Sequence, residues 1–139
     1  MARLYVKQRH KNDCGVAALA MAVNQPYEVI ETALGAVADL TQGLNDLHLK
    51  YWLEQNGWAW VEVFINYPRR GKYVQRAVWP PKPFAPVHIV LLQATRDWHY
   101  VVLDGDGTLY DPWDESRDSL SHPDYKMISC VIGLWKVRA

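Results

Sequence analysis

The chain has 139 residues, of which 50% are hydrophobic and 22% are charged, so we expect one folded domain over residues 1–139 and no disorder. Its formal net charge is zero, which argues against a protein that holds nucleic acid through phosphate contacts. No apolar run approaches the roughly 18 residues that cross a bilayer, so we expect no membrane insertion.

The first residues imitate a secretion signal, because four basic side chains precede a short apolar run at 16–23. Asp13, Cys14 and Gly15 interrupt the entry to that run, which favours a chain that is not exported. The two cysteines, Cys14 and Cys130, are too few for a disulfide framework, and no CxxC or paired-His spacing indicates zinc. We therefore expect a reduced, cytoplasmic protein with no metal and no cofactor.

Sequence patterns predict two helices in the first part of the chain. Asn12 or Asp13 can cap a helix from about Cys14 to Val23, a stretch rich in Ala, Leu and Met. Asn24 can cap the next helix, with Pro26 in its first turn, where the missing N–H has no intrahelical partner to lose. The buried face of this second helix should consist of three apolar residues at helical spacing, namely Ile30, Leu34 and Val37.

A third helix should begin at Asn45 or Asp46 and stop at Gly57. Its expected inward residues are Leu47, Tyr51 and Leu53. The rest of the chain is patterned as strands, at 58–65, 86–93, 98–103, 108–111 and 127–137. The Asp-Gly-Asp-Gly sequence at 104–107 indicates a tight hairpin turn. Helices first and strands second predict an α+β fold, with N-terminal helices packed on a C-terminal antiparallel sheet.

Two segments carry charge of one sign. The stretch 66–82 has five basic residues and no acid, and 104–124 has seven acids against one arginine. Such segments are commonly solvated loops, but they could also form complementary surfaces that bind or steer a partner. On the second interpretation, Arg69 and Arg70 are candidate contacts for a substrate.

Cys14 is the first residue with the potential for covalent chemistry. A thiol attacks as its thiolate, and the first turn of a helix favours negative charge through its unpaired N–H groups and its dipole. Asp13 can accept some of those N–H groups, and Gly15 can leave room for a substrate carbonyl beside the sulfur. A cysteine at a helix start can equally be a small buried hydrophobe, so this residue needs partners to be informative.

Three polar residues could supply those partners. Gln8 lies six residues before Cys14, where its amide and the Cys14 backbone N–H could bind an oxyanion, although it could also be an ordinary exposed glutamine. His99 is in a predicted strand and could act as the base. Asp111, set before Pro112 and after the hairpin turn, could orient the His99 ring from the neighbouring strand. The alternative for a single strand histidine is a satisfied core residue.

Other polar and aromatic residues have simpler interpretations. His88 is expected in the core or lining a cleft, and Cys130 is expected to be an inert core thiol. The chain has seven tryptophans, most of which should pack in the core. Trp98 and Trp113 flank the candidate catalytic residues and are candidate substrate contacts.

The segments QRHKNDCGVAALAMA and PVHIVLLQATRDWHYVVLDGDGTLYDPW together resemble the papain-like, bacteriocin-leader-processing (double-glycine) cysteine peptidases. The resemblance covers about residues 5–115, with the middle similar only in pattern. It implies a papain-like fold, Cys14 as nucleophile, Gln8 as oxyanion stabiliser, His99 as base and Asp111 as the residue that orients it. The best-known members of that family are fused to membrane and ATPase parts, which this sequence does not contain. Cleavage of a leader after a glycine pair is therefore not expected to carry over.

The residues favour a thiol hydrolase that cleaves a peptide or protein substrate. Two alternatives stay open. A binding module could hold a peptide or partner in the same cleft without turnover. A transglutaminase-like or deamidating enzyme could use the same chemistry and resolve the acyl-enzyme with a different acceptor. The oligomeric state cannot be predicted from these patterns.

Overall fold

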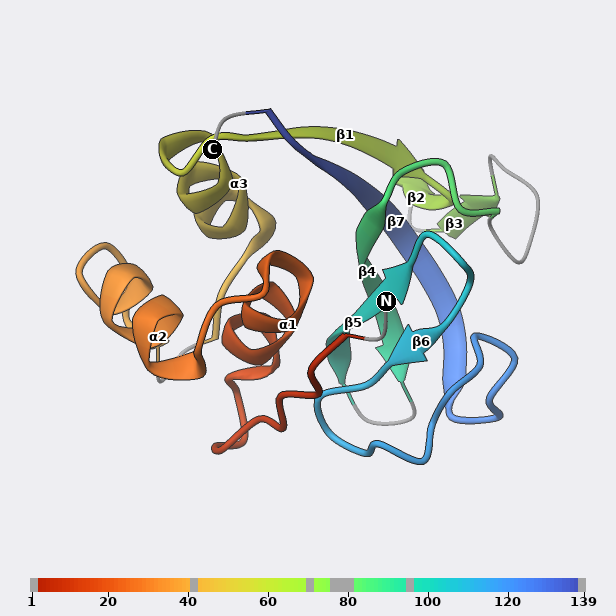
Figure 1. Ribbon diagram of the computed structural model, residues 1–139. Helices are drawn as coiled ribbons and strands as arrows, with labels where there is room; N and C mark the ends of the chain where they lie inside the picture. Colours follow the sequence, from red (N-terminus) through yellow and green to blue (C-terminus); the bar gives the residue numbers. More distant parts are fainter. Residues whose placement is uncertain (1–2, 41–42, 70–71, 76–81, 95–96, 138–139) are drawn as a thin grey trace.

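The computed structural model describes residues 3–40, 43–69, 72–75, 82–94 and 97–137. Three helices precede all the strands (Figure 1): α1 (Cys14–Val23), α2 (Tyr27–Gly35) and α3 (Asp46–Gln55). The strands are β1 (Trp58–Phe64), β2 (Asn66–Arg69), β3 (Lys72–Gln75), β4 (Val87–Ala94), β5 (Trp98–Asp104), β6 (Leu109–Tyr110) and β7 (Tyr125–Lys136). The predicted α+β class, with helices first and an antiparallel sheet second, is confirmed.

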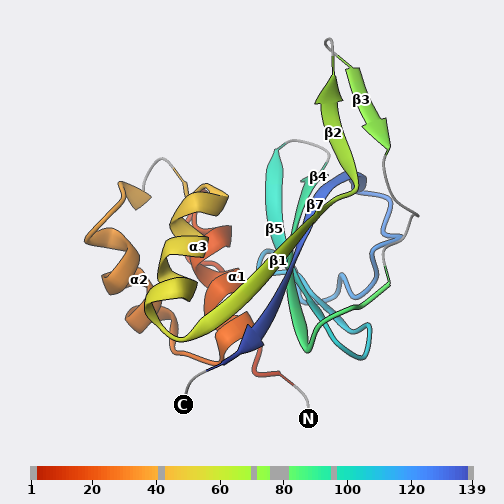
Figure 2. The same ribbon diagram turned by 90° about the horizontal axis from the view of Figure 1, so that it is seen from above.

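The main sheet has five strands in the order β1-β7-β4-β5-β6, and every pair is antiparallel. β4 has a neighbour on each side, which explains why its sequence is almost continuously apolar. β2 and β3 form a separate two-stranded hairpin that projects from the end of the sheet (Figure 2). Part of the basic segment 66–82 therefore forms strands, and this part includes Arg69, whereas Arg70 lies outside the described residues.

The helix α1 is buried on all sides, between the sheet and the other helices. Every residue from Gly15 to Val23 is buried, and the helix packs against β5, β4 and α2. Its Ala-rich sequence suits this position, because small side chains allow close approach to neighbours on every face. The helix that begins at Cys14 is thus the most firmly held element of the helical layer.

The opposite face of the sheet has its own hydrophobic core, to which none of the three described helices contributes a residue. Its members include Val90, Leu92, Val101 and Ile128. The long segment between β6 and β7 covers it, with Leu120 and Tyr125 among the buried residues, and Figure 2 shows this segment on the side of the sheet away from the helices. The acidic segment 104–124 therefore covers part of a hydrophobic core in addition to carrying charge.

Three local expectations about the helices were wrong. Asn24 does not cap α2; it ends α1 in the left-handed conformation (φ 57°), which Asn tolerates better than most residues. Pro26 instead occupies the cap position of α2. In α3, Leu47 and Tyr51 are exposed (68% and 51%), whereas Leu53 is buried as expected, together with Leu49 and Trp52. Val37 is also exposed, since α2 already ends at Gly35.

The first residues are tied to the end of α1 and to the β5–β6 turn. The Arg3 guanidinium donates to the Met21 and Ala22 carbonyl oxygens at 3.1 and 2.9 Å. The same group donates to both carboxylate oxygens of Asp104 at 3.2 Å. A cation at the C-terminal end of a helix is favourable. Within the described ranges, no helix has the length and apolar character needed to span a membrane.

Candidate active site

Cys14 is the first residue of α1 and is a free, half-buried thiol. Asp13 precedes it, but its side chain does not cap the helix as expected. The buried Asp13 carboxylate instead accepts hydrogen bonds from the backbone N–H groups of Arg9 (2.9 Å) and His10 (3.0 Å) and from the Tyr27 hydroxyl (2.5 Å). Asp13 therefore fixes the loop that leads into the helix, and it leaves the helix N–H groups near Cys14 to other partners.

Neighbouring residues closely border the space that a side chain at Gly15 would occupy. A Cβ built on it would lie 3.2 Å from Leu44 Cβ and 3.5 Å from Tyr100 Cδ2. The missing side chain is what lets the start of α1 pack closely against these two residues. Gly15 thus supports the position of Cys14 through packing.

His99 and Asp111 lie together, as their places on neighbouring strands predict. β5 and β6 pair with Val102 opposite Tyr110, so continuing this register puts Asp111 diagonally across from His99 on the same face. The distance between His99 Nε2 and Asp111 Oδ1 is 2.6 Å, and both side chains are buried. The ring nitrogen Nε2 is thereby committed to the carboxylate.

Asp111 is held from several directions. Its Oδ1 also accepts the Trp113 backbone N–H at 2.8 Å, and its Oδ2 accepts the Tyr125 hydroxyl at 2.5 Å. The Arg117 guanidinium lies 4.0 Å from Oδ2. Burial opposes a charge on Asp111, but the hydrogen bonds from His99, Tyr125 and Trp113 outweigh it and lower the pKa of the carboxyl. Asp111 is therefore a fully buried, ionised carboxylate.

The His99 side chain is also close enough to Cys14 to interact with it, and both residues line the same cleft. Burial acts to lower the pKa of His99, but the hydrogen bonds and charges of Asp111 and Cys14 outweigh burial and raise it to about 9. The Trp113 ring packs edge-on against the imidazole, with centroids 6.0 Å apart. An imidazole placed between a thiol and a carboxylate in this way can hold and transfer a proton.

Gln8 lies beside Cys14 in the same cleft, but its amide is engaged. Nε2 donates to the carbonyl oxygens of His10 at 2.9 Å and Lys11 at 3.4 Å. Its Oε1 is buried and, among the described residues, has no hydrogen-bond partner. The Gln8 backbone N–H donates to Pro112 O at 2.8 Å, which joins this loop to the segment that carries Asp111.

The cleft that contains these residues has a volume of about 820 Å³. One wall is the loop 7–12 with the start of α1, and a second is formed by residues 43–46. The third wall comes from the ends of β4 and β5 with Trp98 and Trp113, whose side chains are 43% and 48% exposed. Both tryptophans thus lie where a substrate could touch them, as expected from the sequence.

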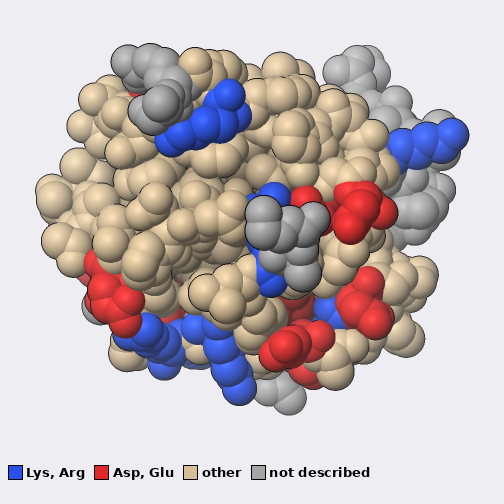
Figure 3. Space-filling view, viewed as in Figure 1, with Lys and Arg blue, Asp and Glu red and all other residues tan. Residues whose placement is uncertain are grey.

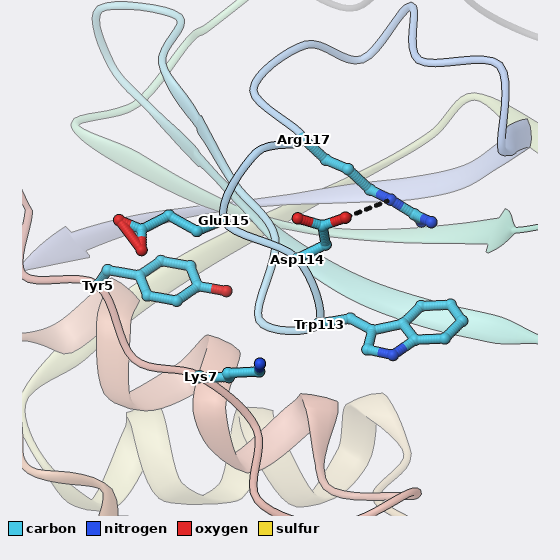
Figure 4. Close-up of a pocket in the computed structure, with 6 residues that line it drawn as sticks. All are labelled: Tyr5, Lys7, Trp113, Asp114, Glu115 and Arg117. Atoms are coloured by element: carbon cyan, nitrogen blue, oxygen red, sulfur yellow. Dashed lines mark ion pairs between the residues drawn. The ribbon is translucent and has the colours of Figure 1, made fainter.

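A smaller cavity of about 580 Å³ adjoins the cleft, with Lys7 and Trp113 lining both. Figure 4 shows the residues that surround it: Tyr5, Lys7, Trp113, Asp114, Glu115 and Arg117. Arg117 reaches toward Asp114 (3.8 Å), lies over the Trp113 ring and pairs with Asp124. Tyr5 donates to the Asp111 carbonyl oxygen at 2.5 Å. This cavity therefore sits directly behind the segment that carries Asp111.

His88 and Cys130 are core residues, as their interpretation from sequence suggested. The Nε2 atom of His88 accepts hydrogen bonds from the backbone N–H groups of Phe84 and Ala85, both at 3.0 Å, and its Nδ1 lies 2.8 Å from the Leu103 carbonyl oxygen. Burial lowers the pKa of His88. Burial raises the pKa of the Cys130 thiol to about 12.

In the part of the chain that the structure describes, no three His, Cys, Asp or Glu side chains gather so that they could hold a metal ion.

Tyr125 was missed by sequence reasoning, and so was the true role of Asp13. A lone Tyr at the start of a strand carries no signal that its hydroxyl meets an Asp 14 residues earlier. Asp13 was assigned to the helix cap because Asp is common there. Both contacts depend on how loops fold back, which local patterns do not encode.

No protein-family model matches the sequence, and no curated protein is similar enough to match. The structure is similar to the crystal structure of a double glycine motif protease from an AMS/PCAT transporter in complex with the leader peptide. The similarity has a TM-score of 0.62 and 17% sequence identity, and it covers 96% of this chain and 91% of that chain. The fold is that of a papain-like peptidase. The papain-like architecture expected from the motif segments is thus confirmed at the level of fold.

Proposed function

We propose that this papain-like protein is a cysteine peptidase that cleaves a peptide or protein substrate with Cys14 as nucleophile. The observation that carries the proposal is the buried His99–Asp111 pair at 2.6 Å, placed in a cleft with the thiol at the start of α1. A core histidine would not need a buried carboxylate on one ring nitrogen and a half-exposed thiol on the other side. A reduced, cytoplasmic setting suits a catalytic thiol and is part of the proposal.

In this mechanism His99 and Cys14 act as a proton-transfer pair. In the proposed cycle the Cys14 thiol gives its proton to His99, and the raised pKa of that ring, about 9, keeps the proton there until the leaving group takes it. The Cys14 sulfur attacks the substrate carbonyl carbon and forms a tetrahedral oxyanion. His99 then gives its proton to the leaving amine, which departs and leaves a thioester. Water, deprotonated by His99, attacks the thioester and releases the acid and the free thiol.

Asp111 orients the imidazole and stabilises its positive charge throughout this cycle. Because Asp111 is ionised and its own oxygens are held by Tyr125 and Trp113, the His99 ring is fixed with Nε2 toward the carboxylate. In the proposed cycle the remaining ring nitrogen exchanges the proton with the sulfur. In this role Asp111 need never take the proton itself.

The oxyanion would be bound by the Cys14 backbone N–H and the Gln8 side-chain amide. The Gln8 Nε2 has two hydrogens, and its bond to Lys11 O at 3.4 Å is the longer of the two that it makes. Exchange of that long bond for a developing oxyanion would favour the transition state over the ground state. Gln8 is therefore proposed as the second oxyanion donor, released from the loop carbonyl as the intermediate forms.

A peptide is the proposed substrate for two reasons. The cleft has a volume of about 820 Å³ and is lined by two exposed tryptophans, and the protease of similar fold was crystallised with a peptide. The geometry supports formation of a thioester but does not choose its acceptor. Water gives hydrolysis, whereas an amine gives acyl transfer, and attack at a side-chain amide gives deamidation. Mass spectrometry separates these products, since only peptide-bond hydrolysis shortens the chain.

The test is digestion of a complex peptide mixture by the purified protein, followed by mass spectrometry of the products. The wild type and a Cys130→Ala control should generate the same new peptide ends, and Cys14→Ala should generate none. Circular dichroism of Cys14→Ala should match the wild type, which separates lost chemistry from lost fold. Cleavage that persists in Cys14→Ala would overturn the proposed nucleophile.

A further inference from the structure

The wall of the cleft that leads to Cys14 is basic. Residues 7–11 read Lys-Gln-Arg-His-Lys, and all five line the cleft together with Cys14. In Figure 3, blue side chains gather at the lower edge of the molecule, below α1 and the segment that enters it. The positive charge therefore borders the proposed reaction site rather than a remote surface.

The loop that displays these cations is held in place. Asp13 accepts the backbone N–H groups of Arg9 and His10, and the Gln8 backbone N–H donates to Pro112 O. Each of these bonds ties the backbone and leaves the long basic side chains free to extend. The basic wall is thus a fixed feature of the cleft, which a ligand meets without first having to order it.

The charges on this wall are only partly balanced within the protein. Arg9 is committed to Glu28 at 2.5 Å and lies over the Tyr27 ring. Lys7 and Lys11 are exposed and have no ion pair with any residue in the described ranges. Of the two carboxylates that line the cleft, Asp46 is paired with Lys50 at 2.9 Å. Within the cleft this leaves Asp97 as the carboxylate near the two lysines and the protonated His99, and Lys7 also borders the adjoining cavity that Asp114 and Glu115 line.

Apolar side chains also line the cleft. Leu91 and Ala94 of β4 and Trp98 of β5 are among them, and Asp97 lies next to Trp98 in the chain. A ligand that uses both the basic loop and these apolar side chains has a negative group and an apolar group. In a peptide, these groups are an Asp or Glu side chain and a neighbouring aliphatic or aromatic side chain.

We propose that the cleft selects acidic peptides, in which a carboxylate side chain lies against Lys7 and Lys11 and an apolar side chain lies against Trp98 and Leu91. This inference rests on the proposed function, because it names the substrate class of the same cleft. The lysines act through charge, on binding and on the approach of the substrate, and they take no part in bond making or breaking.

The first test uses Cys14 itself as a sensor of local charge. The protein is alkylated with iodoacetate, which is anionic, and in parallel with iodoacetamide, which is neutral and similar in size. The ratio of the two rate constants at Cys14 reports the electrostatic potential at the sulfur. His99 contributes equally in all variants, so changes in the ratio between variants report the lysines alone.

The double variant Lys7→Gln with Lys11→Gln should lower this ratio roughly two- to fivefold at low ionic strength, as expected for two charges acting through water. The difference should shrink in high salt. Lys136→Gln is the matched control, because Lys136 is also exposed but lies at the far end of β7, over Trp58. A ratio that is the same in the double variant and the wild type would overturn the proposal.

The second test measures binding without turnover. Three fluorescein-labelled peptide pools of equal length, identical except for Glu, Gln or Lys at alternate positions, are titrated onto Cys14→Ala and followed by anisotropy. The Glu pool should bind most tightly, and its advantage over the Gln pool should disappear when the two lysine substitutions are added. Equal affinity for the Glu and Gln pools would refute the acidic preference.

The two proposals fail in distinguishable ways. If the wild type cleaves peptides but neither the alkylation ratio nor the binding order responds to the lysines, the peptidase stands and the acidic preference is wrong. If the Glu pool binds best but no pool or mixture is ever cleaved, the acidic preference stands and the peptidase proposal fails.

Discussion

The Tyr125 hydroxyl donates a hydrogen bond of 2.5 Å to Oδ2 of Asp111, while Oδ1 of the same carboxylate lies 2.6 Å from His99 Nε2. The carboxylate is thus held at both oxygens, and the His99 ring takes its orientation from a group that cannot rotate. The start of β7 thereby reaches the proposed catalytic centre without touching the cleft.

Substitution Tyr125→Phe should weaken both the fold and the proposed chemistry. It keeps the buried ring but leaves Oδ2 of Asp111 without its closest donor, and an unsatisfied buried acceptor costs about 1–3 kcal/mol. Because the lost bond is one of those that lower the pKa of Asp111, that pKa should rise. Urea unfolding gives the free-energy change, and kcat should fall more than KM rises. Tyr51→Phe, on the exposed side of α3, is the control and should leave both unchanged.

The pH dependence of stability should show the His99–Asp111 pair. The pKa of His99 is about 9 in the folded protein, above its ordinary value of 6.5, so the folded state binds the proton more tightly. The stabilisation is fully present below about pH 6.5 and is lost as the pH rises through 9. Unfolding by urea between pH 6 and 10 should therefore show a decline in the free energy of unfolding, and His99→Gln should flatten this decline.

The rate of peptide cleavage should have an alkaline limb in the same region. A protonated His99 is needed to give a proton to the leaving amine, and its pKa is about 9. A profile of kcat/KM that stays flat to pH 10 would contradict His99 as the proton donor. Asp111→Asn should move the alkaline limb to lower pH, because it removes the charge that holds the proton on His99.

The two thiols should differ strongly in reactivity. Cys14 borders the cleft beside a protonated imidazole, whereas Cys130 is buried and its pKa is raised to about 12. Iodoacetamide near pH 7 should label Cys14 in the folded protein at least tenfold faster than Cys130, as measured by mass spectrometry of tryptic peptides. His99→Ala should slow the labelling of Cys14. Equal labelling of both thiols in the native protein would contradict the proposed role of Cys14.

Asp13→Asn should loosen the loop that carries Gln8. The substitution keeps the volume but replaces one carboxylate oxygen by an amide group, which cannot accept from Arg9, His10 and Tyr27 together. We expect a loss of about 1–3 kcal/mol in stability, since Asp13 is buried. Cleavage should slow further than this destabilisation explains at temperatures where the variant is folded. Tyr27→Phe removes one of the three bonds and should give a smaller effect on both.

Much of the fold could be predicted from local patterns. The helix from Cys14 to Val23 has the predicted bounds, because its apolar sequence is bounded by a polar loop on one side and Asn24 on the other. The pairing of His99 with Asp111 followed from the short turn at 104–107, which leaves few ways for two strands to meet. These features depend on neighbours close in sequence.

What could not be predicted depends on contacts between distant segments. The pattern of α3 predicts Leu47, Tyr51 and Leu53 as inward residues. Of these, Leu53 alone is buried, and Leu49 and Trp52 are buried with it, because the buried face depends on where α3 packs against the rest of the fold. The close packing of Leu44 against Gly15 depends on a loop that a helical pattern does not place. The partners of the Gln8 amide are likewise set by how the loop 8–13 closes on itself.

The segment between β6 and β7 begins at Asp111 and leads into Tyr125, the first residue of β7, and it covers the second core of the sheet. Asp111 at its start and Tyr125 just after its end are hydrogen-bonded to each other, and the same Asp111 carboxylate orients His99. Local opening of this segment, with the helices still folded, would break the hydrogen bond between Tyr125 and Asp111 and abolish the proposed activity. On heating, activity would then be lost before the helical circular dichroism signal. The rate of hydrogen exchange of the backbone amides at 112–124 would match the rate at which activity is lost.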